Sequence, residues 1–232
     1  MKLTWFGHSA FRIDLDGAAI LLDPFLSGNP RFTGDRAKAA EGATHIILTH
    51  GHEDHTGDSV TIARATGAQI ISNFEVCMYL SAQGASNINP GNTGGTIDCG
   101  SFTVSFTPAL HSSAAIVNGQ PVYLGSPNGI VIKPKGGPSI YHMGDTDLFS
   151  DMALIAELYA PQIGLVPVGG RFTMSGATAA LAVKRYFQFK TAVPCHYGTF
   201  DVLAPDASAF VAAMQGHATK VAVLSVGETL EL

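Results

Sequence analysis

Short apolar runs separated by turn residues occupy the first quarter of the chain. Residues 3–6, 11–15 and 18–22 each have the length of a β-strand, and an Asp-Gly dipeptide between the last two is typical of a hairpin turn. Residues 45–49 form a compact apolar run of the kind found in buried strands. The pattern therefore predicts a β-sheet built from these N-terminal segments.

Helix-like and strand-like patterns alternate in the rest of the chain. Helices are expected over residues 58–65, 74–82, 149–159, 177–187 and 205–214. Further strands are expected over residues 68–72, 101–107, 129–133, 139–142, 163–168, 191–195 and 221–224. Residues 87–96, rich in Gly, Asn and Thr, and the residues after His111 are expected to form loops. This order predicts a mixed α/β fold, and because no linker interrupts it, residues 1–232 are expected to form one domain.

Composition and charge narrow the function classes. The chain is 46% hydrophobic and 13% charged, which excludes a disordered protein, and its three cysteines are too few for a disulfide framework. No run approaches the roughly 18 apolar residues of a membrane-spanning helix, and the N-terminus lacks the apolar core of a signal peptide. A cytoplasmic protein without a membrane partner is expected.

The charge pattern argues against a nucleic-acid partner. Thirteen basic and 18 acidic residues give a formal net charge of −5, and the longest basic run is Lys184-Arg185. The expected partner is a small-molecule substrate. A charged fraction this low also leaves many neutral groups on the surface, which is compatible with a homo-oligomer.

The candidate chemistry is concentrated in a histidine-rich segment. Residues 50–55, His-Gly-His-Glu-Asp-His, directly follow the predicted strand at 45–49. In an extended segment His50 and His52 share one face, whereas Asp54 and His55 follow where the backbone turns toward a helix. Imidazole and carboxylate suit zinc, and also manganese, nickel and iron. The segment therefore predicts a metal site, with zinc as the default ion.

Three later residues repeat this placement after a strand. His111 follows the predicted strand at 101–107, Asp145 follows 139–142, and His196 follows 191–195. Each alone is an ordinary loop residue. Ordered behind the first cluster, they complete a set of ligands large enough for two metal ions.

This order of residues resembles the metallo-β-lactamase superfamily, and most closely its branch of UPF0173 metal-dependent hydrolases, relatives of the ascorbate-6-phosphate lactonases. Other segments share the likeness: Gly7-His8-Ser9-Ala10-Phe11, Leu22-Asp23-Pro24, His111-Ser112-Ser113, Gly144-Asp145-Thr146, Val166–Met174 and Pro194–Phe200. The matches extend from residue 4 to about residue 200. One departure is that Ser175-Gly176 stands where the branch usually has an acidic residue before an Ala pair.

The resemblance implies an αββα four-layer sandwich, two mixed β-sheets flanked by helices, with the metals at one edge. It implies that the first metal is held by His50, His52 and His111, that the second is held by Asp54, His55 and His196, and that Asp145 bridges the two.

Such a site implies hydrolysis by a metal-bound hydroxide. Two divalent ions, two carboxylates and a bridging hydroxide leave a net charge of about +1, which favours a small anionic substrate. The expected bond is ester-like: a lactone, a phosphodiester or an amide. Asp54 is a candidate to hold the attacking water. His8, in the turn between the first two strands, is a candidate to contact the substrate or to protonate the leaving group.

Residues near these motifs receive lesser roles. Asp23 is a candidate to orient a ligating histidine, and Arg171 to meet an anionic group of the substrate. Structural roles are expected for His45, His142 and His217, for the core residue Cys195, and for Asp98 and Asp147 in turns.

Other functions of the same pattern remain open. A non-catalytic metal- or ligand-binding protein would retain the same ligands. A di-iron relative would have Glu at the position of His52 and would need a flavin partner domain, and an RNA-processing nuclease would need an added domain or basic arm.

Overall fold

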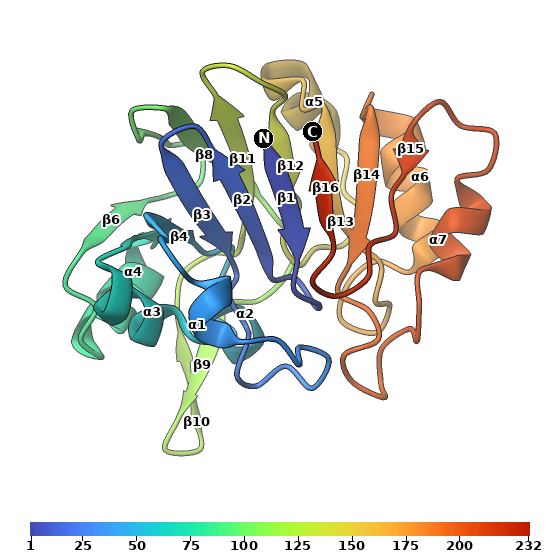
Figure 1. Cartoon of the computed structure of the whole chain (residues 1–232). Helices are drawn as coiled ribbons and strands as arrows, with labels where there is room; N and C mark the ends of the chain where they lie inside the picture. The colour runs from blue at the N-terminus through green and yellow to red at the C-terminus, as the bar shows by residue number, and fades with distance from the viewer.

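The computed structural model describes residues 1–232 and contains two seven-stranded sheets that face each other (Figure 1). The first sheet has the order β16-β1-β2-β3-β4-β5-β6. Its strands are β1 (Lys2–Trp5), β2 (Phe11–Leu15), β3 (Ala18–Leu22), β4 (His45–Ile47), β5 (Gln69–Asn73), β6 (Ile88–Gly91) and β16 (Thr229–Glu231). The pairs from β16 to β3 are antiparallel, and those from β3 to β6 are parallel. The sheet is therefore mixed.

The second sheet has the order β15-β14-β13-β12-β11-β8-β7 and is also mixed. Its strands are β7 (Thr96–Asp98), β8 (Phe102–Pro108), β11 (Asn128–Pro134), β12 (Ile140–His142), β13 (Ile163–Pro167), β14 (Thr191–Cys195) and β15 (Lys220–Val221). The strands from β7 to β12 pair antiparallel, and those from β12 to β15 pair parallel. A separate hairpin of β9 (Ala114–Val117) and β10 (Gln120–Tyr123) projects below both sheets (Figure 1).

Helices cover the outer faces of both sheets. They are α1 (Arg36–Ala39), α2 (Glu53–Thr56), α3 (Ser59–Thr66), α4 (Phe74–Ala82), α5 (Met152–Tyr159), α6 (Gly176–Tyr186) and α7 (Ser208–Ala213). Side-chain caps begin three of them: Asp35 accepts the backbone N–H groups of Ala37 and Lys38 at the start of α1, Asn73 accepts that of Val76 at α4, and Ser175 accepts that of Thr178 at α6. The fold is the αββα sandwich that the resemblance implies.

Alternation along the strands explains the layers. In β3, Ile20 and Leu22 point into the core of 39 buried residues between the sheets, whereas Leu21 joins the second core of 17 residues. That second core lies beneath α1, α3 and α4 and includes Ala39, Ile62 and Val76 from these helices. Because both faces of such a strand are covered, its sequence is apolar throughout, which made the central strands recognisable.

The structure corrects several expected elements. The residues after His111 form the β9–β10 hairpin rather than a loop, and its turn is Asn118-Gly119, both with positive φ, a sequence typical of tight hairpins. The expected loop at 87–96 contains β6, whose Pro and Gly disfavour strands and are tolerated at a sheet edge. The expected strand at 221–224 overlaps β15 only at Val221.

The expected helices at 149–159 and 205–214 are shorter, since α5 begins after Asp151 and α7 after Ala207. No helix of the structure has the length and hydrophobicity that crossing a bilayer requires.

Candidate metal centre

Four strand ends deliver the predicted ligands to one edge of the sandwich. The first group consists of His50, His52 and His111, and one ring nitrogen of each lies within 4.8 Å of the others. His50 and His52 follow β4, and His111 follows β8. Gly51 gives this short segment its close packing, because a Cβ there would lie 2.5 Å from a Leu124 methyl carbon.

Thr49 fixes the ring of His50. The Thr49 hydroxyl donates a hydrogen bond to Asp23 Oδ2 over 2.7 Å, so its oxygen can accept a hydrogen bond from the N–H of His50 Nδ1, 3.0 Å away. This arrangement places the proton of His50 on Nδ1 and leaves Nε2 with a lone pair toward the other histidines. His50 Nε2 lies 2.8 Å from His52 Nδ1.

The second group consists of His8, Asp54, His55 and His196, whose candidate ligand atoms also lie within 4.8 Å of one another. His55 is fully buried and donates from Nδ1 to Asp23 Oδ2 over 2.7 Å. Its Nε2 therefore faces Asp54 and Asp145, at 4.0 Å and 3.4 Å from their Oδ2 atoms. The contact that the sequence suggested between Asp23 and a histidine of the cluster is present.

Asp145 lies between the two groups. Its Oδ2 is 2.9 Å from His196 Nε2, 3.4 Å from His55 Nε2 and 3.6 Å from His111 Nε2. Burial alone would raise the pKa of this carboxyl group, but the charges of His196 and His55 outweigh it and hold the pKa well below its usual range. Asp145 is therefore an anion shared by both groups.

The histidines divide by charge. Burial, with the charge of His55, lowers the pKa of His50 well below its ordinary value, and burial likewise lowers the pKa values of His52 and His111. Burial also acts against a proton on His55, but Asp145, Asp23 and Asp54 raise its pKa well above the ordinary value. The first group is thus neutral, the form in which imidazole binds metals.

Several buried atoms of the site have no hydrogen-bond partner, which provides a test of whether metal ions fit. They include His55 Nε2 and His196 Nε2, whose contacts with Asp145 Oδ2 at 3.4 Å and 2.9 Å lack hydrogen-bond geometry, and Asp145 Oδ1. An unpaired buried polar atom costs about 1–3 kcal/mol, so three together need an external partner. Nitrogen and carboxylate oxygen at these separations are a donor set for divalent transition metals. The residues therefore fit the metal ions that the sequence implies.

His8 lies beneath Asp54 rather than at the site's surface. Its ring is fully buried, with Nδ1 2.9 Å from Thr199 Oγ1 and Nε2 3.0 Å from Asp54 Oδ2. Burial lowers the pKa of His8 to about 4, so the ring is neutral near pH 7. Both nitrogens are engaged, and the ring has no exposed surface for the direct substrate contact that the sequence favoured.

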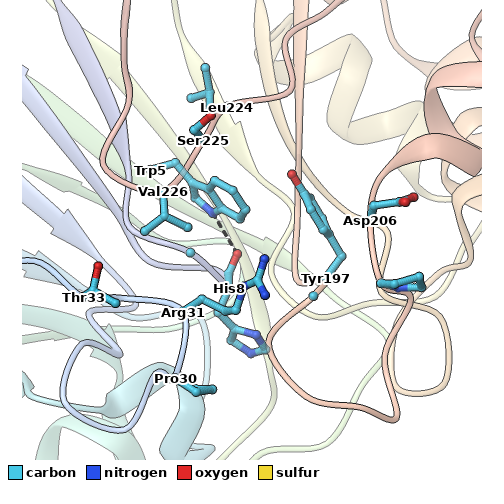
Figure 2. Close-up of a pocket in the computed structure, with 13 residues that line it drawn as sticks. Trp5, His8, Pro30, Arg31, Thr33, Tyr197, Asp206, Leu224, Ser225 and Val226 are labelled. Carbon is cyan, nitrogen blue, oxygen red and sulfur yellow. Dashed lines mark hydrogen bonds between the residues drawn. The ribbon is translucent and has the colours of Figure 1, made fainter.

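His8 also lines a neighbouring pocket of about 560 Å³. Trp5 and Tyr197 line it as well, with ring centroids 5.2 Å apart. Figure 2 shows the Trp5 indole N–H donating to the His8 carbonyl oxygen, over 3.0 Å. The same oxygen accepts the backbone N–H of His196 over 2.9 Å. The second of these bonds connects the first turn of the chain to the last candidate ligand.

Backbone strain is concentrated in the same place. His8, Asp23 and His196 have φ of 52°, 42° and 60°, a region that only a few per cent of non-glycine residues adopt. Such strain persists only where surrounding contacts hold it and is common at functional sites. Beside His196, Gly169 leaves no room for a side chain, because a Cβ would lie 1.9 Å from the His196 carbonyl oxygen.

The remaining histidines and Cys195 lie outside the two ligand groups. His45 bonds Thr44 and packs against Phe102, His217 accepts the Thr219 N–H, and Cys195 is buried in the core. His142 is buried with its Nε2 3.5 Å from Asp23.

Arg171 is exposed and stacks over Phe172 at 5.6 Å. Thr49 and Thr199 are two further residues of the site that the sequence did not indicate, since their only signal is that each adjoins a histidine motif.

Comparison with known proteins defines the class. Residues 2–196 match the family model described as "Beta-lactamase superfamily domain". The structure aligns with the metallo hydrolase Igni18 of Ignicoccus hospitalis at a TM-score of 0.87 and 36% identity, covering 100% of this chain and 98% of that one. It aligns with the metallo-beta-lactamase fold protein YhfI of Bacillus subtilis at 0.76 and 14% identity, over 99% of each chain, which supports the fold alone.

Two curated relatives are closer in sequence. The chain is 66% identical over 227 residues to a UPF0173 metal-dependent hydrolase of Methylocella silvestris, covering 98% of both chains. It is 54% identical to one of Mesorhizobium japonicum, covering 100% of both. The fold and the buried His/Asp cluster therefore belong to a metal-dependent hydrolase of the metallo-β-lactamase superfamily. Within it, the chain belongs to the UPF0173 metal-dependent hydrolase family.

Proposed function

We propose that this hydrolase uses two divalent metal ions to cleave an ester-like bond, a lactone or a phosphodiester, in a small anionic substrate. The observation that carries the proposal is the position of Asp145, whose Oδ2 lies within 3.6 Å of ring nitrogens from both groups. A carboxylate between two sets of ligands could serve as a ligand shared by two metal ions.

The ligands follow from the two groups. His50, His52 and His111 would hold the first ion, and Asp54, His55 and His196 the second, with Asp145 between them. Bound there, two divalent ions would lower the pKa of a coordinated water toward neutrality and polarise the bond to be cleaved. Zinc is the default ion for such ligands, and manganese, nickel and iron also suit them.

The protein's own residues set the geometry. Asp54 keeps 31% of its side-chain surface exposed, so one of its oxygens is accessible from solvent while Oδ2 is held by His8. Because the Asp54 carboxylate can only accept, the neutral His8 ring donates to it from Nε2, and His8 Nδ1 accepts from the Thr199 hydroxyl at 2.9 Å in place of the longer 3.3 Å contact of that hydroxyl with the Tyr197 carbonyl oxygen. We assign His8 the role of a positioning residue that acts through Asp54. Asp54 in turn can orient a water molecule for attack.

The bond type is tested by assaying metal-reconstituted protein on a lactone and on an activated phosphodiester. Hydrolysis of one of them, abolished by chelation and restored by metal, is expected. Asp145→Asn should lower kcat by at least about a hundredfold, because it removes the shared anion. His217→Ala, which removes a histidine outside the cluster, serves as the matched control. Folded, metal-loaded protein that cleaves neither bond contradicts the proposal and favours a non-catalytic metal-binding protein.

A further inference from the structure

A groove of about 490 Å³ opens directly beside the first histidine group. His111 and Ser112 line one end of it, and Pro121 and Tyr123 of the β9–β10 hairpin line its wall. Ser112 Oγ also lies 3.4 Å from His52 Nε2. The groove therefore begins at His111, a member of the candidate metal centre, and runs along the hairpin.

One face of the hairpin is apolar and unpartnered. Strand register pairs Ala114 with Tyr123 and Ile116 with Pro121, and directly opposed residues project to the same face. Ile116 and Tyr123 are each 70% exposed. The other face carries Ala115, which packs against the core beneath the outer helices. Ala114, Pro121 and Tyr123 of the exposed apolar face line the groove, and Ile116, opposite Pro121, extends this face beyond the groove lining.

The composition of the hairpin is unusual for exposed strands. Residues 114–123, AAIVNGQPVY, contain no charged side chain. Exposed edge strands ordinarily carry charges that prevent association, and contiguous apolar surface on a soluble protein commonly marks a binding site. This face therefore has the chemistry of a surface that an apolar group covers.

The hairpin is also fixed to the metal centre. Ser113 Oγ donates to the Leu124 carbonyl oxygen and accepts the backbone N–H of Gly51, each over 3.0 Å. Gly51 lies between His50 and His52. A group that lies along the hairpin is thus held at a set distance from the ligands.

We propose that the face formed by Ala114, Ile116, Pro121 and Tyr123 binds an apolar alkyl or aryl part of the substrate whose scissile bond lies at the metal centre. This inference rests on the proposed function and specifies its substrate class: an anionic or hydrolysable head with an apolar substituent. Continuity of the groove with His111 is the reason for choosing a substrate over other occupants.

The test measures binding of straight-chain carboxylates, from acetate to octanoate, to metal-reconstituted protein by titration calorimetry. A carboxylate head suits the cationic centre, and the chain should lie in the groove. In the wild type each added methylene should lower Kd by about two- to fourfold. Tyr123→Ser and Ile116→Ser should flatten this dependence while leaving acetate binding unchanged. Val117→Ser, on the opposite face, should keep the wild-type dependence.

The outcomes separate this inference from the proposed function. If Kd does not depend on chain length, or if the groove variants keep the full dependence, the apolar subsite is refuted although the metal centre binds carboxylates. If the dependence is present but no ester-like bond is cleaved, the subsite stands and the proposed reaction fails. A shift from dimer to monomer in Tyr123→Ser, with unchanged chain dependence, overturns the proposal in favour of a second copy of the chain.

Discussion

Replacement of Asp23 by Asn tests whether a residue that binds no metal sets the affinity of the centre. Asp23 is fully buried and accepts three hydrogen bonds: from the Thr49 N–H at 2.8 Å, the Thr49 hydroxyl at 2.7 Å and His55 Nδ1 at 2.7 Å. All three groups face it as donors. An amide must place an NH₂ group against at least one of them.

The expected cost follows from these contacts. One donor opposed by the amide is left unsatisfied, which costs about 1–3 kcal/mol of unfolding free energy. Because Asp23 orients His55 directly and His50 through Thr49, both ligand groups lose their orientation. Loss of such a partner typically lowers metal affinity by about 10- to 100-fold. We therefore expect Asp23→Asn to weaken metal binding by about 1.4–2.7 kcal/mol in addition to its effect on folding.

Two assays separate these effects. Denaturant unfolding of the metal-free protein gives the stability loss, and competition with a chromogenic chelator gives the affinity for each ion. Asp58→Asn is the matched control, because Asp58 accepts hydrogen bonds from the backbone N–H groups of Leu26 and Ser27 in a neighbouring loop. This substitution is predicted to lower stability without changing metal affinity. Chelator competition of Asp23→Asn that matches the wild type would refute the orienting role.

Three further predictions concern the second group and the thiols. Gly169→Ala should remove the second metal from reconstituted protein, as elemental analysis would show, because the new Cβ displaces the His196 carbonyl; two ions retained would contradict this. In metal-free protein, burial lowers the pKa of His8 from 6.5 to about 4. Between these pH values His8 is protonated in the unfolded state and neutral in the folded state, so the free energy of unfolding should fall by about 3 kcal/mol as pH drops from 6.5 to 4. His8→Gln should lose stability less steeply in that window, and equal slopes would refute the assignment. Burial raises the pKa of Cys77 to about 12, and burial together with the charge of Asp98 raises the pKa of Cys99 to about 11. A thiol reagent at pH 8 should therefore label both cysteines far more slowly in folded than in denatured protein, and equal rates would refute this.

The sequence predicted the parts of the fold that local patterns specify. The strands at 11–15 and 18–22 have the predicted bounds because their apolar residues and the turn between them are both local signals. The metal-ligand candidates were found because each follows a strand, and the strand ends that carry them meet at one edge. The peripheral strands β6 and β16 were missed because they contain few apolar residues, so that little besides their backbone hydrogen bonds marks them as strands.

The environment of His8 depends on contacts between distant segments and could not be predicted. Its partners, Asp54 and Thr199, lie 46 and 191 residues away, and no local pattern indicates either contact. The hairpin beside His111 is different, since Asn118-Gly119 is a local turn signal for it.

Elemental analysis of the purified protein, before and after chelation and reconstitution, tests whether the centre is dinuclear. We expect about two divalent ions per chain, because the two ligand groups share Asp145. His50→Ala and Asp145→Ala should lower that number, whereas His217→Ala should not. Folded, reconstituted protein that holds no metal would contradict the dinuclear centre and the hydrolysis proposed for it.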